Sequence, residues 1–323
     1  MKAIVYYHYG SPDVLACEEM EKPRAGDNEV LIKVRAASVN PLDWHLLRGT
    51  PYLLRLMAGL RKPKVPRSGV DVAGQVEAVG RDVTQFKPGD EVFGSCRGAF
   101  AEYVCAPERA LVLKPATVTF EQAASVPGAA LTALQVLRDT GQIRPGQKVL
   151  INGAAGGVGT FAVQIAKALG AEVTGVCSTR NVDMVRSLGA DRVIDYTRED
   201  FTKGTQRYDV ILDCIGNHSF SGCRRVLNPK GTCVMVGGPN EGQWIGPLAG
   251  VLKRLVLSRF ASQKFAMFLT RPNKEDLTIL RELLEAGKVT PVIDRRYSLN
   301  EVPEAIRYLE EGHARGKVVI TLE

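Results

Sequence analysis

A glycine-rich turn near the middle of the chain constrains the fold most strongly. The apolar run 149–151 leads into Gly153, Gly156 and Gly159, and a segment with helical apolar periodicity follows over 161–169. A strand, a tight turn and a helix in this order can hold a dinucleotide pyrophosphate, because glycines allow close approach and the helix N-terminus offers free N–H groups. A second apolar segment, 172–177, completes a βαβ unit.

The turn therefore predicts a nucleotide-binding site. Its spacing is G-x-x-G-x-x-G instead of G-x-G-x-x-G, and glycines also mark ordinary turns, so a purely structural αβ turn is the alternative. The residues expected to contact the phosphates are Gly153, Ala155, Gly156, Gly157, Val158 and Gly159.

The residues after the second strand indicate which dinucleotide is bound. NAD-dependent proteins usually place Asp or Glu there, whereas this chain has Ser178, Thr179 and Arg180. Two hydroxyls and a guanidinium suit a 2′-phosphate, so we expect NADPH. Alternatively, Arg180 is a solvated surface charge. Tyr196 follows the third strand and is a candidate to cover the adenine, or an aromatic residue without a ligand.

Composition limits the other classes of function. The net charge of +7, from 42 basic and 35 acidic residues, suits an anionic cofactor, and no nucleic-acid-reading motif is present. The seven cysteines are scattered and form no C-x-x-C, which predicts a reducing compartment. The chain begins with a strand-like pattern and not with a targeting segment, so we expect a cytoplasmic protein, although a processed imported protein would look the same.

The pattern along the chain predicts two domains in an α/β protein. Residues 1–118 show short alternating strands with frequent turns, which predicts a β-rich, barrel-like domain. Residues 119–272 alternate helices with six buried strands, which predicts a doubly wound parallel sheet. Residues 273–323 add two helices and two strands that could return to the first domain. The six strands are expected at 148–152, 172–177, 192–195, 208–213, 231–237 and 264–269.

Two segments, 52–62 and 244–257, are both apolar and basic, and 46–69 holds six basic residues and no acidic one. These segments could pack on the body of the protein or on a subunit. Alternatively, they line the entrance for a lipophilic substrate or contact an anionic membrane surface.

Motifs along the whole chain resemble the medium-chain dehydrogenase/reductase superfamily, and its zinc-free quinone-oxidoreductase branch in particular. Within that branch the chain is similar to reticulon-interacting NADPH oxidoreductases and alkenal/enone reductases. The resemblance implies a GroES-like catalytic domain, an inserted Rossmann domain and a homodimer. The motifs that carry it lie at 37–43, 69–74, 86–92, 153–159 and 312–317.

The same comparison predicts the absence of zinc. Zinc-dependent relatives carry Cys within the segment that here reads Asn40 to Asp43, and Gly-His-Glu where this chain has Gly69-Val70-Asp71. Cys96 and Cys105 do not form the cluster of four cysteines found in those relatives. We therefore expect no bound metal.

The resemblance also implies the remaining site residues. Asn40 and Asp43 match a pair beside the nicotinamide; Asn40 would orient the nicotinamide or the substrate, and Asp43 would support it or serve only as a helix cap. His45 and Tyr52 are candidate proton donors, or structural residues. The implied cofactor contacts, each of which could instead be a turn or core residue, are Pro127, Thr132, Cys214, Ile215, Gly216, Val236, Gly237, Gly238 and Lys317.

Together these features predict an enzyme that moves hydride from NADPH to a small lipophilic quinone or α,β-unsaturated carbonyl without a metal. The alternatives are a reductase of other conjugated carbonyls such as enoyl thioesters, and a non-catalytic NADPH-binding sensor or scaffold.

Overall fold

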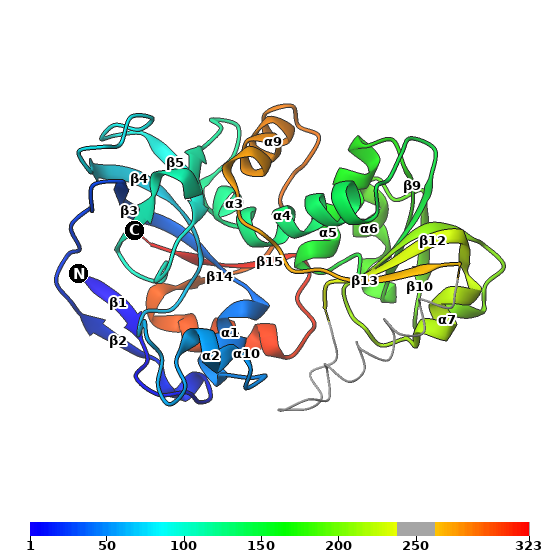
Figure 1. The fold of residues 1–323 in the computed structure, drawn as a ribbon, viewed down its shortest axis with the longest axis horizontal. Helices are drawn as coiled ribbons and strands as arrows, with labels where there is room; N and C mark the ends of the chain where they lie inside the picture. The colour runs from blue at the N-terminus through cyan, green and yellow to red at the C-terminus, as the bar shows by residue number, and fades with distance from the viewer. Residues whose placement is uncertain (238–261, 323) are drawn as a thin grey trace. The chain divides into compact units, whose positions relative to one another are not determined.

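The structure is a computed structural model that describes residues 1–237 and 262–322 (Figure 1). The chain divides into two compact units. Unit 1 comprises Met1–Leu131, Arg271–Gly287 and Pro291–Glu323, and unit 2 comprises Thr132–Thr270 and Lys288–Thr290. This division falls within helix α4 (Pro127–Gln135). The domain limits inferred from the sequence, at 118/119 and 272/273, stay a prediction.

Unit 2 contains a six-stranded, all-parallel sheet in the order β10-β9-β8-β11-β12-β13. The predicted doubly wound sheet is confirmed. Strand order reverses between β8 and β11, which is where such sheets bind ligands at their carboxyl edge. The strands are β8 (Lys148–Asn152), β9 (Glu172–Cys177), β10 (Arg192–Asp195), β11 (Tyr208–Asp213), β12 (Leu227–Met235) and β13 (Lys264–Met267).

Helix α5 (Gly157–Ala168) follows β8 and is buried along most of its length, with Phe161 fully inaccessible. It begins four residues before the predicted segment, because Gly157 and Gly159 form its first turn instead of ending the loop. The other elements of unit 2 are α6 (Val182–Ser187), α7 (Phe220–Arg225), the short helices η4 (Thr179–Asn181) and η5 (Phe201–Lys203), and a π-helical turn at Val136–Thr140.

Unit 1 is built around a seven-stranded sheet in the order β14-β15-β3-β4-β5-β7, with β6 also pairing with β3. β15 pairs antiparallel with β3, Val318 opposite Val39, so β15 lies in the same sheet as the N-terminal strands of unit 1. The strands are β3 (Glu29–Val39), β4 (Asp71–Val79), β5 (Glu91–Ser95), β6 (Tyr103–Pro107), β7 (Leu111–Leu113), β14 (Ile293–Ser298) and β15 (Lys317–Thr321), with a separate pair β1 (Lys2–Val5) and β2 (Ala16–Glu19).

The core of unit 1 draws on both ends of the chain. Ile32, Val72 and Phe100 pack in one apolar cluster with Ile306 and Val318. The helices of this unit are α1 (Pro41–Arg48), α2 (Leu54–Ala58), α3 (Phe120–Ala124), α9 (Lys274–Glu285) and α10 (Val302–Glu310), with short 3-10 turns at Pro12–Val14, Glu108–Ala110 and Leu299–Glu301.

Two further questions raised by the sequence concern the apolar, basic segments and the membrane. The apolar, basic segment 244–257 lies outside the described residues. In the ranges 1–237 and 262–322, none of the helices combines the length and the apolar character needed to cross a bilayer.

Candidate functional site

A buried polar cluster lies in unit 1 where β3 ends and α1 begins. Ser38, Asn40 and Asp43 come from this junction, Asp71 opens β4, and Lys317 opens β15. The sheet brings them together, because Ser38 is paired with Asp71 and Val39 with Val318. All five side chains are buried, and the sheet register therefore determines a polar site within an apolar core.

The Asn40 side chain is held in one orientation by its neighbours. Its Oδ1 accepts a hydrogen bond from Lys317 Nζ at 2.6 Å, and its Nδ2 donates to Asp71 Oδ2 at 2.9 Å and to the Ser38 carbonyl at 3.3 Å. Because an ammonium group can only donate, the amide oxygen must face Lys317. Both amide hydrogens are then used, and the Asn40 side chain can offer a ligand only an acceptor lone pair.

The carboxyl groups of Asp43 and Asp71 accept hydrogen bonds from nearby donors, and the Lys317 ammonium stabilises their negative charge. Asp43 Oδ2 accepts from the Asn40 backbone N–H at 2.7 Å and completes a capping box at the start of α1. Burial raises the pKa of Asp43 to about 7 and also raises that of Asp71, while Lys317 acts in the opposite direction on both. Burial lowers the pKa of Lys317 itself.

Gly128, beside the predicted Pro127, lies against this cluster. Its backbone N–H donates to Asp71 Oδ2 at 3.0 Å, and a Cβ there would lie 2.9 Å from Asp71 and 3.0 Å from Asn40. A side chain at this position would overlap Asp71 and Asn40 and push them apart. Glycine is therefore required here. Asp71 was noted in the sequence only as a departure from a zinc ligand; its central role depends on partners far away in the chain.

His45 and Tyr52, the two candidate proton donors, are half-buried in unit 1. His45 Nδ1 lies 2.8 Å from the Thr50 carbonyl, and the ring stacks on Trp44 at 3.6 Å. Since a carbonyl only accepts, Nδ1 carries the proton and Nε2 of the neutral ring is an acceptor. Burial lowers the pKa of His45, which keeps the ring neutral. This geometry favours orientation of a ligand over proton donation.

The residues at the position of the zinc site in related proteins do not fit a zinc ion. Asn40, Asp43 and Asp71 surround an ammonium group, and burial raises the pKa of the Cys96 thiol, which disfavours a thiolate ligand. Within the two described ranges, no group of three His, Cys, Asp or Glu side chains is arranged to hold a metal.

The glycine turn in unit 2 fits a dinucleotide pyrophosphate. Gly153 has a φ of +85°, and a Cβ at Gly159 would lie 2.1 Å from the Gly153 carbonyl, so both glycines are needed to close the turn. Gly156 is different: it caps α5, a helix of twelve residues, and among the described residues a Cβ there would approach the Gly153 oxygen alone, at 3.5 Å. The N–H groups of such a helix N-terminus suit a phosphate.

Ser178, Thr179 and Arg180 lie where β9 ends and η4 begins, as the sequence predicted. The Thr179 hydroxyl donates to Asp195 Oδ2 at 2.6 Å, and Ser178 Oγ accepts from Asn181 at 3.2 Å. Asp195, at the end of β10, was missed in the sequence because it belongs to the next strand; parallel pairing with Cys177 brings it to this edge. The Thr179 hydroxyl proton is therefore already engaged, which makes Thr179 a poorer donor to a ligand than the sequence suggested.

A second hydrogen-bonded group holds the loop after β11. Asp213 Oδ1 accepts from Asn152 Nδ2 at 2.9 Å and from the backbone N–H groups of Ile215 and Gly216 at 3.1 and 2.8 Å. This fixes Cys214, Ile215 and Gly216 beside the glycine turn. Asn152 and Asp213 were not predicted; the signal was a polar residue at the carboxyl end of each of two apolar strands.

The other predicted contacts are placed as follows. Val236 and Gly237 follow β12, and a Cβ at Gly237 would lie 2.1 Å from the Cys214 carbonyl. Thr132 Oγ1 lies 2.5 Å from Thr270 Oγ1. Tyr196 is 58% exposed, which fits both a ring that covers an adenine and an aromatic residue without a ligand, and Gly238 lies outside the described residues.

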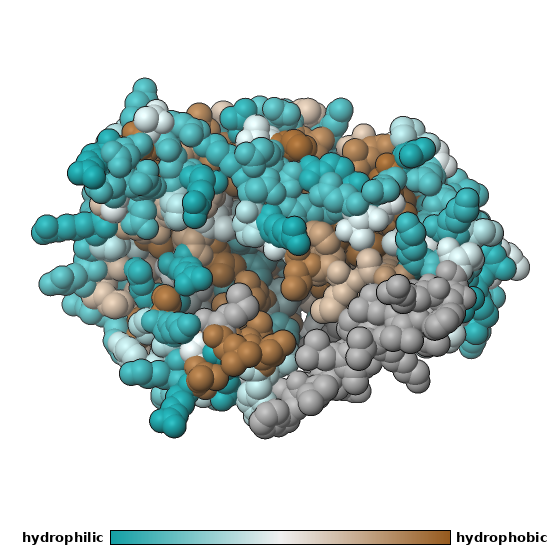
Figure 2. All heavy atoms as spheres, viewed as in Figure 1, coloured by the Kyte–Doolittle hydropathy of each residue, from teal (hydrophilic) through white to brown (hydrophobic). Residues whose placement is uncertain are grey.

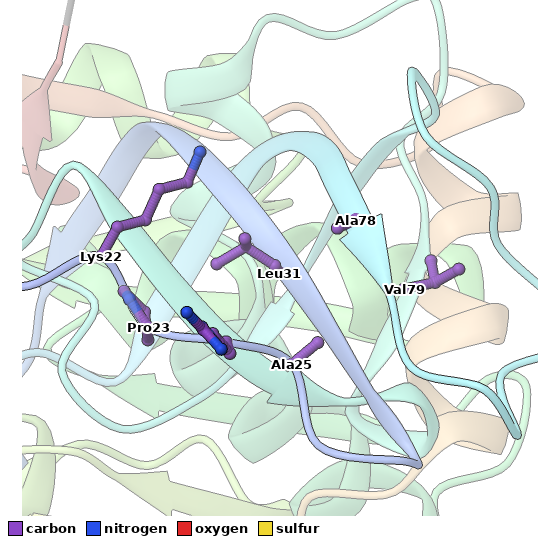
Figure 3. Close-up of a pocket in the computed structure, with 7 residues that line it drawn as sticks. Lys22, Pro23, Ala25, Leu31, Ala78 and Val79 are labelled. Carbon is purple, nitrogen blue, oxygen red and sulfur yellow. The ribbon is translucent and has the colours of Figure 1, made fainter.

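A separate hollow of about 430 Å³ lies on unit 1, between the chain before β3 and strands β3 and β4 (Figure 3). Leu31, Ala78 and Val79 are among its apolar lining residues, and Lys22 and Arg24 also line it. None of the residues of the polar cluster lines it. We assign no chemistry to it.

The fold and these residues define a dehydrogenase/reductase with a GroES-like unit and a dinucleotide-binding unit. Residues 26–116 match the alcohol dehydrogenase GroES-like domain, and residues 188–320 match a domain described as zinc-binding dehydrogenase. The chain belongs to the medium-chain dehydrogenase/reductase superfamily and, within it, to the quinone-oxidoreductase branch.

Three relatives illustrate this membership. The mitochondrial NAD(P)H oxidoreductase RTN4IP1 of Mus musculus is 37% identical over all of this chain and 89% of its own length. The chloroplastic NADPH-dependent alkenal/one oxidoreductase of Arabidopsis thaliana is 35% identical over 99% of this chain and 79% of its own length. The structure of the quinone oxidoreductase from Coxiella burnetii superposes with a TM-score of 0.88 at 32% identity, covering 100% and 99% of the two chains.

Proposed function

We propose that this protein is an NADPH-dependent reductase of quinones or α,β-unsaturated carbonyls that works without a metal. The observation that carries the proposal is the carboxyl edge of the unit 2 sheet. There the helix N-terminus at Gly156 suits a pyrophosphate, and Ser178 and Arg180 suit a 2′-phosphate. The names of the relatives support the same chemistry.

Bound NADPH would supply hydride, which is one proton together with two electrons. In a conjugated carbonyl the hydride adds at the β-carbon, negative charge collects on the carbonyl oxygen, and a proton from solvent or a side chain completes the reduction. Asn40, with one acceptor lone pair left, would bind an N–H group of the nicotinamide amide or a donor on the substrate. Lys317 and Asp71 would hold the side-chain amide of Asn40 in place.

Arg180 provides the test of cofactor choice. Arg180→Gln removes the cation but keeps a polar side chain, so we expect the Kd for NADPH to rise roughly tenfold or more, because the charged hydrogen bond to the 2′-phosphate is lost. The Kd for NADH should change less than about twofold. Calorimetry with both dinucleotides measures this, and Arg186→Gln on α6 is the matched control for loss of one nearby charge.

Equal effects of Arg180→Gln on the two dinucleotides, or tighter binding of NADH by the unchanged protein, would overturn the choice of NADPH. The carboxylate of Asp195 would repel a phosphate close to Thr179. The binding of NADPH therefore depends strongly on the positive charge of Arg180.

Turnover distinguishes the proposed enzyme from its alternatives. NADPH oxidation should be rapid with a panel of quinones and enones, and slower with enoyl thioesters. Preferred turnover of thioesters would favour an enoyl reductase. Tight NADPH binding without turnover of any acceptor would favour a sensor or scaffold. Stoichiometric zinc in the purified active protein would contradict the metal-free mechanism.

We further propose a cytoplasmic homodimer. All seven cysteines are free thiols, and Cys177, Cys223 and Cys233 are buried, as suits a reducing compartment. Sedimentation velocity on the purified protein tests the dimer, and a fluorescent fusion in the source cell tests the compartment.

A further inference from the structure

Helix α2 and the loop after it expose an apolar, basic surface. Leu53 and Leu56 are 54% and 60% exposed and lie one helical turn apart, and Leu60, 68% exposed, follows in the loop after Gly59. Arg61, Lys62 and Lys64 follow directly and are also exposed. We call these six residues the basic leucine surface. Figure 2 shows apolar side chains gathered in the region of α2.

The segment turns its own arginine inward. The guanidinium of Arg55 lies 4.5 Å from the ring centre of Tyr9 and 4.6 Å from that of Tyr52, and its Nε donates to the Gly49 carbonyl at 2.9 Å. A surface helix normally does the reverse, with leucines inside and the cation in water. The inward arginine therefore holds the leucines outward.

The loop that carries the cations is also fixed. Tyr9 Oη donates to the Gly59 carbonyl at 2.5 Å, and the Lys64 backbone N–H donates to the Ala58 carbonyl at 2.7 Å. Gly59 has a φ of +127°, and a Cβ there would lie 2.1 Å from the Lys62 carbonyl, so the turn requires glycine. These hydrogen bonds and the tight turn at Gly59 thus hold the leucines and the cations next to one another.

We propose that the basic leucine surface binds an anionic lipid bilayer, with the leucines in the interface and the cations at the headgroups. Single exposed leucines are ordinary, but three beside three cations match the composition of an interfacial anchor. A second copy fits less well. A twofold contact would place the same cations against each other, and no carboxylate occurs over 46–69 to compensate.

The test uses the full-length protein and sedimentation with vesicles. We expect binding to vesicles of equal parts phosphatidylcholine and phosphatidylglycerol at low salt. Binding to phosphatidylcholine alone should be far weaker, and binding to the mixed vesicles should be lost at about 0.5 M salt. The triple variant Arg61→Glu, Lys62→Glu, Lys64→Glu should lose roughly a hundredfold in affinity, and the double variant Leu56→Ser, Leu60→Ser about tenfold.

Matched controls separate this surface from general charge and hydrophobicity. Arg24→Glu, Lys87→Glu, Lys288→Glu makes the same change in net charge elsewhere, and Leu113→Ser, Ile279→Ser removes two exposed apolar side chains elsewhere. Both should bind vesicles within about threefold of the parent. NADPH affinity and the thermal midpoint should be unchanged in every variant, which shows that each is folded.

Three results would overturn the proposal: no sedimentation at low salt, equal losses in the charge control, or concentration-dependent self-association abolished by Leu56→Ser, Leu60→Ser. The last would assign the surface to a second copy. None of these results bears on hydride transfer, so the proposed function stands or falls separately.

Discussion

The ammonium group of Lys317 shows how single residues determine the chemistry of unit 1. Its side chain is 3% exposed, and it donates to the Val39 carbonyl at 3.1 Å and to Asn40 Oδ1. A buried cation is costly unless it is paired, and here Asp71 and Asp43 carry the opposite charge. The result is a buried polar site in which one ammonium group faces two carboxyl groups and the Asn40 amide is held in one orientation.

Asp43 predicts a dependence of stability on pH. Its pKa of about 7 in the folded protein lies above the value of about 4 in an unfolded chain. Between these values the folded state binds more protons, so the free energy of unfolding falls as pH rises. Asp43→Asn removes this titration and keeps an oxygen for the Asn40 N–H.

We therefore expect the free energy of unfolding of Asp43→Asn, relative to the parent, to rise by roughly 2 kcal/mol between pH 5 and pH 7.5. Urea unfolding at several pH values measures this difference. A difference that is constant with pH would show that Asp43 stays ionised in the folded protein.

His45 gives a second prediction at this scale. Because Nδ1–H is directed to Thr50 and the ring is neutral, Nε2 cannot donate a proton at neutral pH. We expect His45→Gln to keep enone turnover within about threefold at pH 7, with an unchanged pH–rate profile. A tenfold or greater loss, together with loss of a basic limb in the profile, would restore His45 as the proton donor.

At the scale of the elements, two glycines at the start of α5 have different roles, one in the fold and one in ligand binding. Gly159 is needed to close the turn, because a Cβ there would clash with the Gly153 carbonyl and with Ala154. A Cβ at Gly156 would meet, among the described residues, nothing closer than the Gly153 oxygen at 3.5 Å, so we expect glycine to be needed there only if a ligand approaches it. The sequence pattern could not distinguish these roles, since both are glycines at equal spacing.

Two alanine variants test this difference. Gly156→Ala should keep the thermal midpoint and weaken NADPH binding tenfold or more, because the methyl group takes the place of a phosphate oxygen. Gly159→Ala should lower the free energy of unfolding by roughly 2 kcal/mol or more through backbone overlap. Thermal unfolding and calorimetry measure both. Unaltered NADPH affinity in Gly156→Ala would place the pyrophosphate elsewhere.

On the scale of the whole molecule, unit 1 depends on both ends of the chain. β15 lies between β14 and β3 in the sheet, and Val318, Val319 and Ile320 are fully buried. Its first residue is Lys317, so the same strand supplies part of the core and part of the polar cluster. The C-terminus of the chain is therefore structural in unit 1.

Deletion of residues 317–323 should remove protection from the sheet of unit 1. We expect hydrogen exchange at β3 and β4 to rise by several orders of magnitude, because the strand between β14 and β3 is lost. The amides of β8 and β11 in unit 2 should stay protected. Deletion of only 322–323 leaves β15 intact and is the control. Equal loss in both units, or no loss at all, would contradict this division.

Much of the fold could be predicted because its signals are local. The apolar runs of strand length are contiguous in the sequence, and they located all six strands of unit 2. The glycines before α5 and the periodic segment that follows are contiguous as well. The pair Ser178 and Arg180 could be read in the same way, since they directly follow a recognisable strand. The start of α5 was placed late, because Gly157 and Gly159 look like loop residues.

The amino-acid order alone determined the parallel sheet, the glycine turn and the chemical types of side chain available to the site. Tertiary structure decided which of them meet. Lys317 contacts Asn40 across 277 positions, Asp71 contacts Gly128 across 57, and Asp195 reaches Thr179 from a neighbouring strand. Such pairings follow from strand order and register, which are set by burial of the whole core and leave no local trace in the chain.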